Sequence, residues 1–314
     1  MNRSQIIKMI TREIKRHNSF LVTSHINPDG DGICSLLIFA HILKFFNKES
    51  ILFSYHPVPK RLSFLPRVER IKSRTDERYE EIVVLDTPII KRIGIRLPKK
   101  VLINIDHHPS NSYFGTINWV EPSASATCEL LFYFIKEIGI EITEELATLL
   151  YTGLYTETGG FSYPNTNKEA MKISALLLDY GVSPAAISQK VSSLSLKDIR
   201  LLSEVLHNLE FTNGIATIYL TREMQQRLKT TDSQADDFIK FPLSLKGVKV
   251  AIFLREEGPD LVRVSFRSLG EVDVNRLAKR LGGGGHKTAA GTRLYTSLER
   301  AKRDVLKVAR EFIE

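Results

Sequence analysis

An apolar, β-prone run ends abruptly in an acid and two adjacent histidines at Val101-Leu102-Ile103-Asn104-Ile105-Asp106-His107-His108-Pro109. In a parallel sheet this order places Asp106, His107 and His108 at the carboxyl end of a strand, where open α/β sheets bind their ligands. Neighbouring side chains on an extended chain point to opposite sides, so one histidine can face a metal ion while the other faces a substrate. Asp and His are also common in turns, and the tripeptide alone fits a turn equally well.

Strand-like and helix-like segments alternate on the N-terminal side of this run and just beyond it. Short apolar runs bounded by turn residues or charge predict strands, and longer runs with a broad apolar face predict helices. The alternation indicates a doubly wound, mainly parallel sheet. The predicted strands are 20–24, 51–55, 81–85 and 101–105, and the predicted helices are 32–46, 124–138 and 143–155.

A different pattern begins after Gly181-Val182-Ser183-Pro184, and a helix of mixed charge at 195–209 resembles a connector. The predicted strands beyond it are 215–219, 248–255 and 261–267, and the predicted helices are 274–281 and 298–313. The fold class expected is therefore α/β, with an N-terminal parallel-sheet domain and a smaller C-terminal α/β domain. The expected domain bounds are 1–186 for the first domain, 187–212 for a helical linker and 213–314 for the second domain.

The composition is that of an ordinary soluble globular protein, with 43% apolar and 25% charged residues among 314. No secretory signal is evident, and the longest apolar run, 33–46, is shorter than the ~20 residues that span a bilayer, so we expect a cytoplasmic protein without membrane association. Cys34 and Cys128 lack metal-type spacing and indicate small buried residues. The formal charge of +8 fits an anionic partner and fits a solvated basic surface equally well.

Three further groups of acids and histidines follow a predicted strand or end a predicted helix. His25, Asp29 and Asp31 follow the first strand, Asp86 follows the third, and Glu157 follows the helix 143–155. Each has a structural alternative, because Asp29 or Asp31 can cap a helix, Asp86 can belong to a turn, and a frayed helix end can expose Glu157. Together with the opening run they supply enough ligands for two divalent cations, and the oxygen-rich balance favours Mn²⁺ or Mg²⁺. The six candidate ligands are His25, Asp29, Asp31, Asp86, His107 and Glu157.

The second half carries a different chemistry at Gly282-Gly283-Gly284-Gly285-His286. Glycines let a backbone approach a ligand closely, and their N–H groups can surround a phosphate or carboxylate. A glycine run alone is usually a flexible loop. Lys287 beside the run, and Arg263 and Arg267 on the strand before it, favour an anion pocket instead.

These residues together resemble the motifs of the DHH phosphoesterases. The four motifs correspond to His25-x-x-x-Asp29-x-Asp31, Asp86, Asp106-His107-His108 and Thr156-Glu157-Thr158-Gly159. The segment from Val272 through the glycine run to Ala289-Ala290-Gly291 resembles the signature of the DHH-associated C-terminal domain. The five matches occur in the family's order and cover nearly the whole chain. Two-domain chains of this size are similar to bacterial nanoRNases and phosphatases of 3′-phosphoadenosine 5′-phosphate (pAp), which are relatives of RecJ-type exonucleases.

The resemblance implies two divalent cations, Mn²⁺ first and Mg²⁺ or Co²⁺ as alternatives. One ion would be held by His25, Asp29 and Asp86, and the other by Asp31, Asp86, His107 and Glu157, with Asp86 bridging. The family normally has Asp at the position of Glu157, whose longer arm can change the metal geometry.

The resemblance also implies roles at the substrate. Asp106 would orient His107, and His108 would face the scissile phosphate, so Asp106 and His108 are the expected catalytic side chains beside the metal. The residues expected to bind the terminal nucleotide are Arg267, Ser268, Gly283, Gly284, Gly285 and His286.

The implied function is hydrolysis of very short oligonucleotides to mononucleotides, with pAp as a further substrate, by a monomer or homodimer. Three alternatives stay open at this point. Two are enzymes of the same class, a phosphodiesterase for linear or cyclic signalling dinucleotides and a phosphatase acting on pAp alone. The third is a catalytically silent nucleotide-binding regulator.

Overall fold

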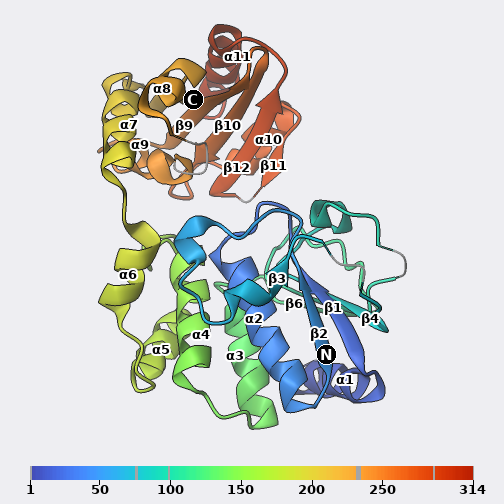
Figure 1. Ribbon diagram of the computed structural model, residues 1–314. Helices are drawn as coiled ribbons and strands as arrows, with labels where there is room; N and C mark the ends of the chain where they lie inside the picture. The colour runs from blue at the N-terminus through green and yellow to red at the C-terminus, as the bar shows by residue number, and fades with distance from the viewer. Residues whose placement is uncertain (1, 75–76, 98–99, 231–234, 286, 314) are drawn as a thin grey trace. The chain divides into compact units, whose positions relative to one another are not determined.

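The computed structural model describes residues 2–74, 77–97, 100–230, 235–285 and 287–313, which fold as two compact units, Met1–Ser193 and Leu194–Glu314 (Figure 1). The predicted linker, 187–212, straddles this division. Helix α6 (Pro184–Ser192) belongs to the first unit, and helix α7 (Leu196–His207) belongs to the second.

The first unit is built on a six-stranded, wholly parallel sheet in the order β3-β2-β1-β4-β5-β6. The chain leaves from the central strand in both directions, which is the strand order of a doubly wound sheet and confirms the predicted fold class. The strands are β1 (Ser19–Thr23), β2 (Glu49–Phe53), β3 (Ile71–Lys72), β4 (Glu81–Leu85), β5 (Ile103–Asp106) and β6 (Ile117–Val120).

Helices cover one face of this sheet. α2 packs against both α3 and α4, and with α1 they form the main apolar core of the unit (Figure 1). The opposite face has a smaller core around Leu21, Phe53 and Val84, to which the 3₁₀ helix η3 (Ile90–Ile93) contributes Ile93. The helices of the unit are α1 (Arg3–Arg16), α2 (Gly30–Phe45), α3 (Thr127–Ile138), α4 (Glu144–Glu157), α5 (Lys168–Leu178) and α6, with short 3₁₀ turns η1 (Lys60–Leu62) and η2 (Val68–Arg70).

The second unit is a mixed sheet between two helical layers, in the strand order β11-β12-β10-β9-β8-β7. Only β8 and β9 run parallel among the described pairs, and the other neighbours are antiparallel. α10 and α11 pack on one face, and α7, α9 and η5 pack on the other. The strands are β7 (Glu210–Thr212), β8 (Ile215–Leu220), β9 (Val250–Gly258), β10 (Leu261–Arg267), β11 (Gly284–Gly285) and β12 (Ala289–Leu294). The helices are α7, α8 (Arg222–Leu228), η5 (Asp236–Ile239), α9 (Lys240–Leu243), α10 (Val274–Arg280) and α11 (Leu298–Arg310).

Several elements were not predicted from the sequence. α1 reads as a charged segment, yet Ile7, Ile10 and Ile14 recur at helical spacing and are buried. β3, β6 and β7 are short strands at sheet edges, where a weak apolar pattern suffices. Cys34 and Cys128 are buried free thiols, as expected. Among the described residues, no helix has the length and apolar character needed to cross a membrane.

Candidate metal centre

The three strands that precede the predicted ligands are neighbours in the sheet. β1, β4 and β5 lie side by side and parallel, so their carboxyl ends meet at one edge. His25 follows β1, Asp86 follows β4 directly, and β5 ends at Asp106, which His107 and His108 follow. This topology explains how residues from three separate parts of the chain come to share one site.

Asp86 lies at the centre of the cluster and is 1% exposed. Its Oδ2 atom lies 3.5 Å from His25 Nε2, and its Oδ1 atom lies 3.6 Å from His107 Nε2. The Thr127 hydroxyl donates a hydrogen bond to Oδ1 at 3.2 Å. The backbone of Asp86 has a φ of 52°, a left-handed conformation that Asp tolerates better than most residues and that is often found at functional sites.

Two groups of side chains at this edge suit a metal ion. His25, Asp29 and Asp86 form one group, and Asp86, His107 and His108 form the other, so Asp86 belongs to both. Ligand atoms about 2.1 Å from a shared ion lie roughly 3 Å apart when adjacent and roughly 4 Å apart when opposite. The Nε2 of His25 lies 3.6 Å from Asp29 Oδ2 and 3.5 Å from Asp86 Oδ2, within that interval. The geometry of this group therefore fits a divalent cation, and Asp86 could be a ligand in both groups.

The ring orientations of His25 and His107 also suit metal binding. His25 Nδ1 lies 2.8 Å from the carbonyl oxygen of Ile26, and His107 Nδ1 lies 3.3 Å from that of Ala124. A carbonyl oxygen only accepts hydrogen bonds, so each Nδ1 carries the proton and each Nε2 faces the acids. This is the arrangement in which a backbone carbonyl fixes the tautomer of a metal-binding histidine.

Asp31 is fully buried and caps a helix from a distance. Its carboxylate accepts hydrogen bonds from the backbone amides of Thr127 at 2.6 Å and Cys128 at 2.9 Å, the first two residues of α3. Ala126, which precedes α3, has no side chain able to cap it. Because a helix N-terminus favours negative charge, α3 stabilises the Asp31 carboxylate, which lies 3.9 Å from His107 Nε2.

The side chain of Asp106 bonds to the ring of His108, whereas the prediction was that it orients the ring of His107. Its Oδ1 atom accepts a hydrogen bond from the ring Nδ1 of His108 at 2.6 Å, and it accepts one from the backbone amide of His107 at 2.9 Å. The prediction that Asp106 orients the His107 ring is therefore wrong for this structure, because the carbonyl of Ala124 occupies that role. Asp106 orients His108.

Asn111 completes the support of Asp106 and was missed from the sequence. Its side-chain amide donates to Asp106 Oδ2 at 2.6 Å and to the carbonyl of Thr87 at 3.2 Å. Its Oδ1 atom accepts from the side chain of Asn104 at 3.0 Å and from the amide of Tyr113 at 2.7 Å. The buried chain Asn104–Asn111–Asp106–His108 thus fixes the His108 ring from within the domain. The only sequence signal was an Asn placed shortly after the two histidines.

Glu157 ends α4, and its side chain reaches the cluster. Its Oε1 atom lies 3.7 Å from His107 Nε2, and its side chain is 23% exposed. Asn165 donates hydrogen bonds to the carbonyls of Glu157 and Ser125, which joins the end of α4 to the loop before α3. The longer arm of Glu157 therefore still brings a carboxylate to His107.

Two glycines at the start of α2 let this edge pack closely. A Cβ atom at Gly30 would collide with Thr156, next to Glu157. A Cβ atom at Gly32 would lie 2.8 Å from the hydroxyl oxygen of Ser24 and 3.3 Å from Asp86 Oδ2. Asp29 accepts a hydrogen bond from the amide of Gly32 at 3.0 Å, so it caps α2 while facing His25. Capping and metal binding are both compatible with its position.

The electrostatics of the cluster reflect a surplus of buried acids. Burial, together with the charge of Asp86, raises the pKa of Asp31 to about 7. Burial and the charges of Asp29, Asp86 and Asp31 raise the pKa of Glu157 well above its usual range. Burial opposes protonation of His25, but Asp29 and Asp86 outweigh it and raise the pKa of that histidine well above its ordinary value.

The pKa values of His107 and Asp86 also shift toward the charged form of each side chain. Burial opposes protonation of His107, yet the charges of Asp86 and Asp31 raise its pKa. Burial opposes ionisation of Asp86, yet its contacts with the three histidines lower its pKa far below the usual range. Positive charge is therefore favoured at the positions that face the carboxylates, which is the electrostatic condition for binding cations.

The predicted substrate residues of the second unit lie around β10 and β11. Arg267 ends β10 and donates from Nη1 to the carbonyl of Phe266 at 3.0 Å, while the buried Ser268 donates from its hydroxyl to Val272 at 2.6 Å. Gly284 and Gly285 form the edge strand β11, paired with Gly291 and Ala290 of β12. His286 lies outside the described residues.

The glycine run is more ordered than a loose phosphate-binding loop. The amides of Gly282 and Gly283 donate to the carbonyls of Lys279 and Ala278, and the amide of Gly285 donates to the side chain of Asn275 at 3.1 Å. A Cβ atom at Gly283 would collide with the backbone of Gly291, so the run is glycine partly because β12 lies so close.

Comparison with known proteins agrees with the motifs. The model of the DHH family, N-terminal domain, matches residues 19–154, and that of the DHHA1 domain matches residues 215–314. The chain is 35% identical over 297 residues to the bifunctional oligoribonuclease and PAP phosphatase NrnA of Thermus thermophilus, covering 92% of this chain and 89% of that protein.

Solved structures show the same fold. An exopolyphosphatase-related protein from Bacteroides fragilis is 32% identical with a TM-score of 0.88, covering 98% of this chain and 95% of that one. RecJ from Thermus thermophilus, solved in complex with Mn²⁺, is 12% identical with a TM-score of 0.56, covering 99% of this chain and 54% of that one. The motifs, the geometry of the sheet edge and these similarities lead to one conclusion: the chain belongs to the DHH family and carries both its N-terminal domain and a DHHA1 domain.

Proposed function

We propose that this chain is a divalent-metal-dependent phosphoesterase that hydrolyses very short oligoribonucleotides to mononucleotides and removes the 3′-phosphate of pAp. The observation that carries the proposal is the convergence of five buried or half-buried side chains with Asp86 at the carboxyl edge of the sheet: His25, Asp29, Asp31, His107 and Glu157. The similarity to a protein named as an oligoribonuclease and PAP phosphatase, over nine-tenths of the chain, supports the choice of substrates.

Two divalent cations, with Mn²⁺ the first choice, are proposed to bind at this edge. His25, Asp29 and Asp86 would hold one of them, as the geometry of that group allows. Asp31, Asp86, His107 and Glu157 would hold the other. When bound, such a pair of ions supplies an activated water and stabilises charge on the phosphoryl oxygens.

The side chains of the domain supply the remaining steps. His108 is proposed to face the scissile phosphate, with its ring fixed by Asp106 at 2.6 Å so that a hydrogen bond can be directed at the phosphoryl group. With Nδ1 of the ring held by Asp106, the Nε2 side is left for the departing 3′-oxygen, which must take up a proton. Thr127 holds the Asp86 carboxylate through its hydroxyl, which keeps the central ligand oriented.

In the second unit, we propose that Arg267 and the glycine run around β11 bind the terminal nucleotide of the substrate. Arg267 offers a guanidinium for phosphate, which it can bind with two parallel hydrogen bonds. Ser268 and Gly285 are proposed to shape this surface, since their polar groups already bond within the unit.

The test uses the purified full-length protein with Mn²⁺ and a panel of 5′-phosphorylated dinucleotide, longer oligonucleotides, a cyclic dinucleotide and pAp. We expect mononucleotides from the dinucleotide and adenosine 5′-phosphate from pAp, with little turnover of the cyclic compound. No turnover of either preferred substrate by protein with full metal content contradicts the proposal. Turnover of the cyclic dinucleotide alone would favour the signalling phosphodiesterase.

A further inference from the structure

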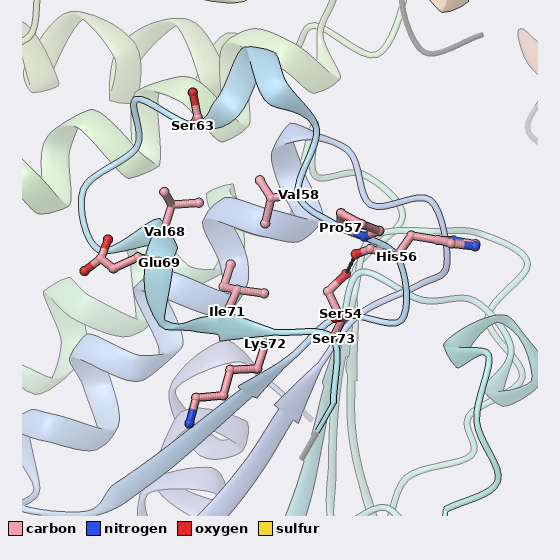
Figure 2. A pocket seen from close by; sticks show the side chains of 10 residues that line it. All are labelled: Ser54, His56, Pro57, Val58, Ser63, Val68, Glu69, Ile71, Lys72 and Ser73. Carbon is pink, nitrogen blue, oxygen red and sulfur yellow. Dashed lines mark hydrogen bonds between the residues drawn. The ribbon is translucent and has the colours of Figure 1, made fainter. Parts of the chain in front are cut away.

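A cavity separate from the metal ligands opens at the carboxyl ends of β2 and β3 (Figure 2). Its volume is about 280 Å³, near the lower limit for small-molecule sites and enough for one planar base. β2 is the direct neighbour of β1, the strand that precedes His25. The residues that line it are Ser54, His56, Pro57, Val58, Ser63, Val68, Glu69, Ile71, Lys72 and Ser73.

The interior of this cavity is apolar and its rim is polar. Val58, Val68 and Ile71 are half-buried, and Figure 2 shows their side chains directed toward one another across the cavity. The exposed Ser63 and Ser73 lie at the rim. Apolar walls with a few hydroxyl groups at the rim suit the flat face and polar edges of a nucleobase.

The charged side chains do not make this a phosphate pocket. The Lys72 ammonium pairs with Glu77 at 2.7 Å, and Glu69 adds a carboxylate to the lining. A free phosphate would therefore meet a negative charge and a lysine that already has a partner. An uncharged ring fits the lining better.

A hydrogen bond joins the cavity to the loop that carries the metal ligands. The amide of Asn27, two residues after His25, donates to His56 Nδ1 at 3.0 Å. The Ser54 hydroxyl donates to the carbonyl of His56 at 2.7 Å, which fixes the cavity wall. Adjacent strands lie roughly 5 Å apart, so the ends of β2 and β3 lie roughly 5 to 10 Å across the sheet from the end of β1. One nucleoside can extend over that distance from a phosphate at the metal centre.

The proposed substrates differ on one side of the scissile phosphate only. In pAp this phosphate is attached to the 3′-oxygen of adenosine 5′-phosphate and carries nothing else. In a dinucleotide it also carries the nucleoside on its 3′ side. With either substrate, water adds to phosphorus, the bond from phosphorus to the 3′-oxygen breaks, and that oxygen takes up a proton. With the dinucleotide, the second product is therefore a 5′-mononucleotide.

We propose that the cavity at the carboxyl ends of β2 and β3 binds the base of the nucleoside on the 3′ side of the scissile phosphate. The cavity is thus a specificity site that dinucleotides use and pAp does not. This inference rests on the proposed function, which names both substrates.

Two variants, Val68→Trp and Val58→Trp, fill the cavity with an indole ring. Val191→Trp is the matched control, because Val191 is a half-buried valine of the same unit that does not line the cavity. The measurement is the ratio of kcat/KM for the dinucleotide pApA to kcat/KM for pAp, with Mn²⁺. A third substrate has the same 5′ half and an abasic ribose on the 3′ side. Thermal unfolding of each variant shows whether it folds.

We expect each cavity variant to lower that ratio by about ten-fold or more, the usual effect of losing the packing of one base. The control should leave the ratio unchanged. The unsubstituted protein should have a lower kcat/KM for the abasic substrate than for pApA, by a similar factor. Val68→Trp should lower kcat/KM for the abasic substrate little further.

An unchanged ratio in both folded variants, or equal turnover of pApA and the abasic substrate by the unsubstituted protein, overturns the cavity proposal alone. If a variant fails to fold, the comparison of pApA with the abasic substrate still decides. Failure of the unsubstituted protein to hydrolyse pApA and pAp would instead overturn the proposed function.

Discussion

Replacing Asn111 by alanine tests how His108 is held. Asn111 donates to Asp106 Oδ2 at 2.6 Å, and Asp106 Oδ1 accepts from His108 Nδ1 at 2.6 Å. The alanine leaves one oxygen of a fully buried carboxylate without this donor, so the carboxylate can rotate and its hold on His108 weakens. Asn104 loses one acceptor but keeps a second, Asn118 Oδ1 at 3.2 Å.

The size of the effect follows from these contacts. A hydrogen bond to a charged group contributes about 1.5–3 kcal/mol, and a buried group left without its partner costs about 1–3 kcal/mol. We therefore expect Asn111→Ala to lower the free energy of unfolding by about 2–4 kcal/mol. We expect kcat for a dinucleotide to fall by roughly 10- to 100-fold, the range seen when a group supporting a site residue is removed. KM should change less, because His108 is proposed to face the phosphate and not the nucleosides.

Asn118→Ala is the matched control. Asn118 bonds to Asn104 and to the backbone of Gly115, within the same group of amides, but among the described residues it makes no hydrogen bond to Asp106. Urea unfolding and steady-state kinetics at saturating Mn²⁺ are measured for both variants. Both should lose stability, and only Asn111→Ala should lose kcat. Equal kcat in the two variants, at temperatures where both are folded, refutes the role of Asn111 as a positioning residue.

Further predictions concern the charges of the metal centre. Asp86→Asn should abolish turnover and weaken binding of both ions, because Asp86 belongs to both ligand groups, and this is measured by metal titration calorimetry together with activity. Chelation should abolish turnover and lower the melting temperature, and added Mn²⁺ should restore both; a metal-free protein that stays active contradicts this expectation. Glu157→Gln should raise the stability of the metal-free protein, because it removes a buried acid whose pKa burial and neighbouring carboxylates raise, but lower that of the Mn²⁺-loaded protein. The folded pKa of Asp31 is raised from 3.8 to about 7, so its contribution to stability is present at low pH and is lost as the pH rises between those values. The raised pKa of His25 acts in the same direction above pH 6.5, so urea unfolding of the metal-free protein should show falling stability from pH 5 to pH 8.

The position of the site could be predicted from the sequence because it depends on strand ends. Apolar runs that stop at His25, Asp86 and Asp106 predict three buried strands, and a parallel sheet gathers their carboxyl ends. The order of the strands is not written in these runs, but β1, β4 and β5 are neighbours, so the argument from the sheet edge holds.

The contacts of single side chains could not be predicted in the same way. Whether Asp106 bonds to His107 or to His108 depends on side-chain rotamers and on the carbonyl of Ala124, which comes from a loop 16 or more residues away. The partners of Asp31 are backbone amides of α3. Every residue except proline has a backbone amide, so residue types do not predict this contact. The cavity at the carboxyl ends of β2 and β3 depends on β3, a two-residue strand whose pattern is too short to recognise.

The fold holds its acids in place before any substrate binds, and this has an energetic consequence. Asp31 is buried against the N-terminus of α3, and Asp86 lies among three histidines, so both carboxylates are oriented by the protein itself. Asp31 and Glu157 nevertheless have raised pKa values, which means that these partners do not fully offset the cost of burial and the repulsion among the acids. Divalent cations would remove that repulsion, so part of their binding free energy would appear as stability of the sheet edge. The buried acids thus make the metal-free protein less stable, but they form a set of ligands that would need little rearrangement on binding the ions.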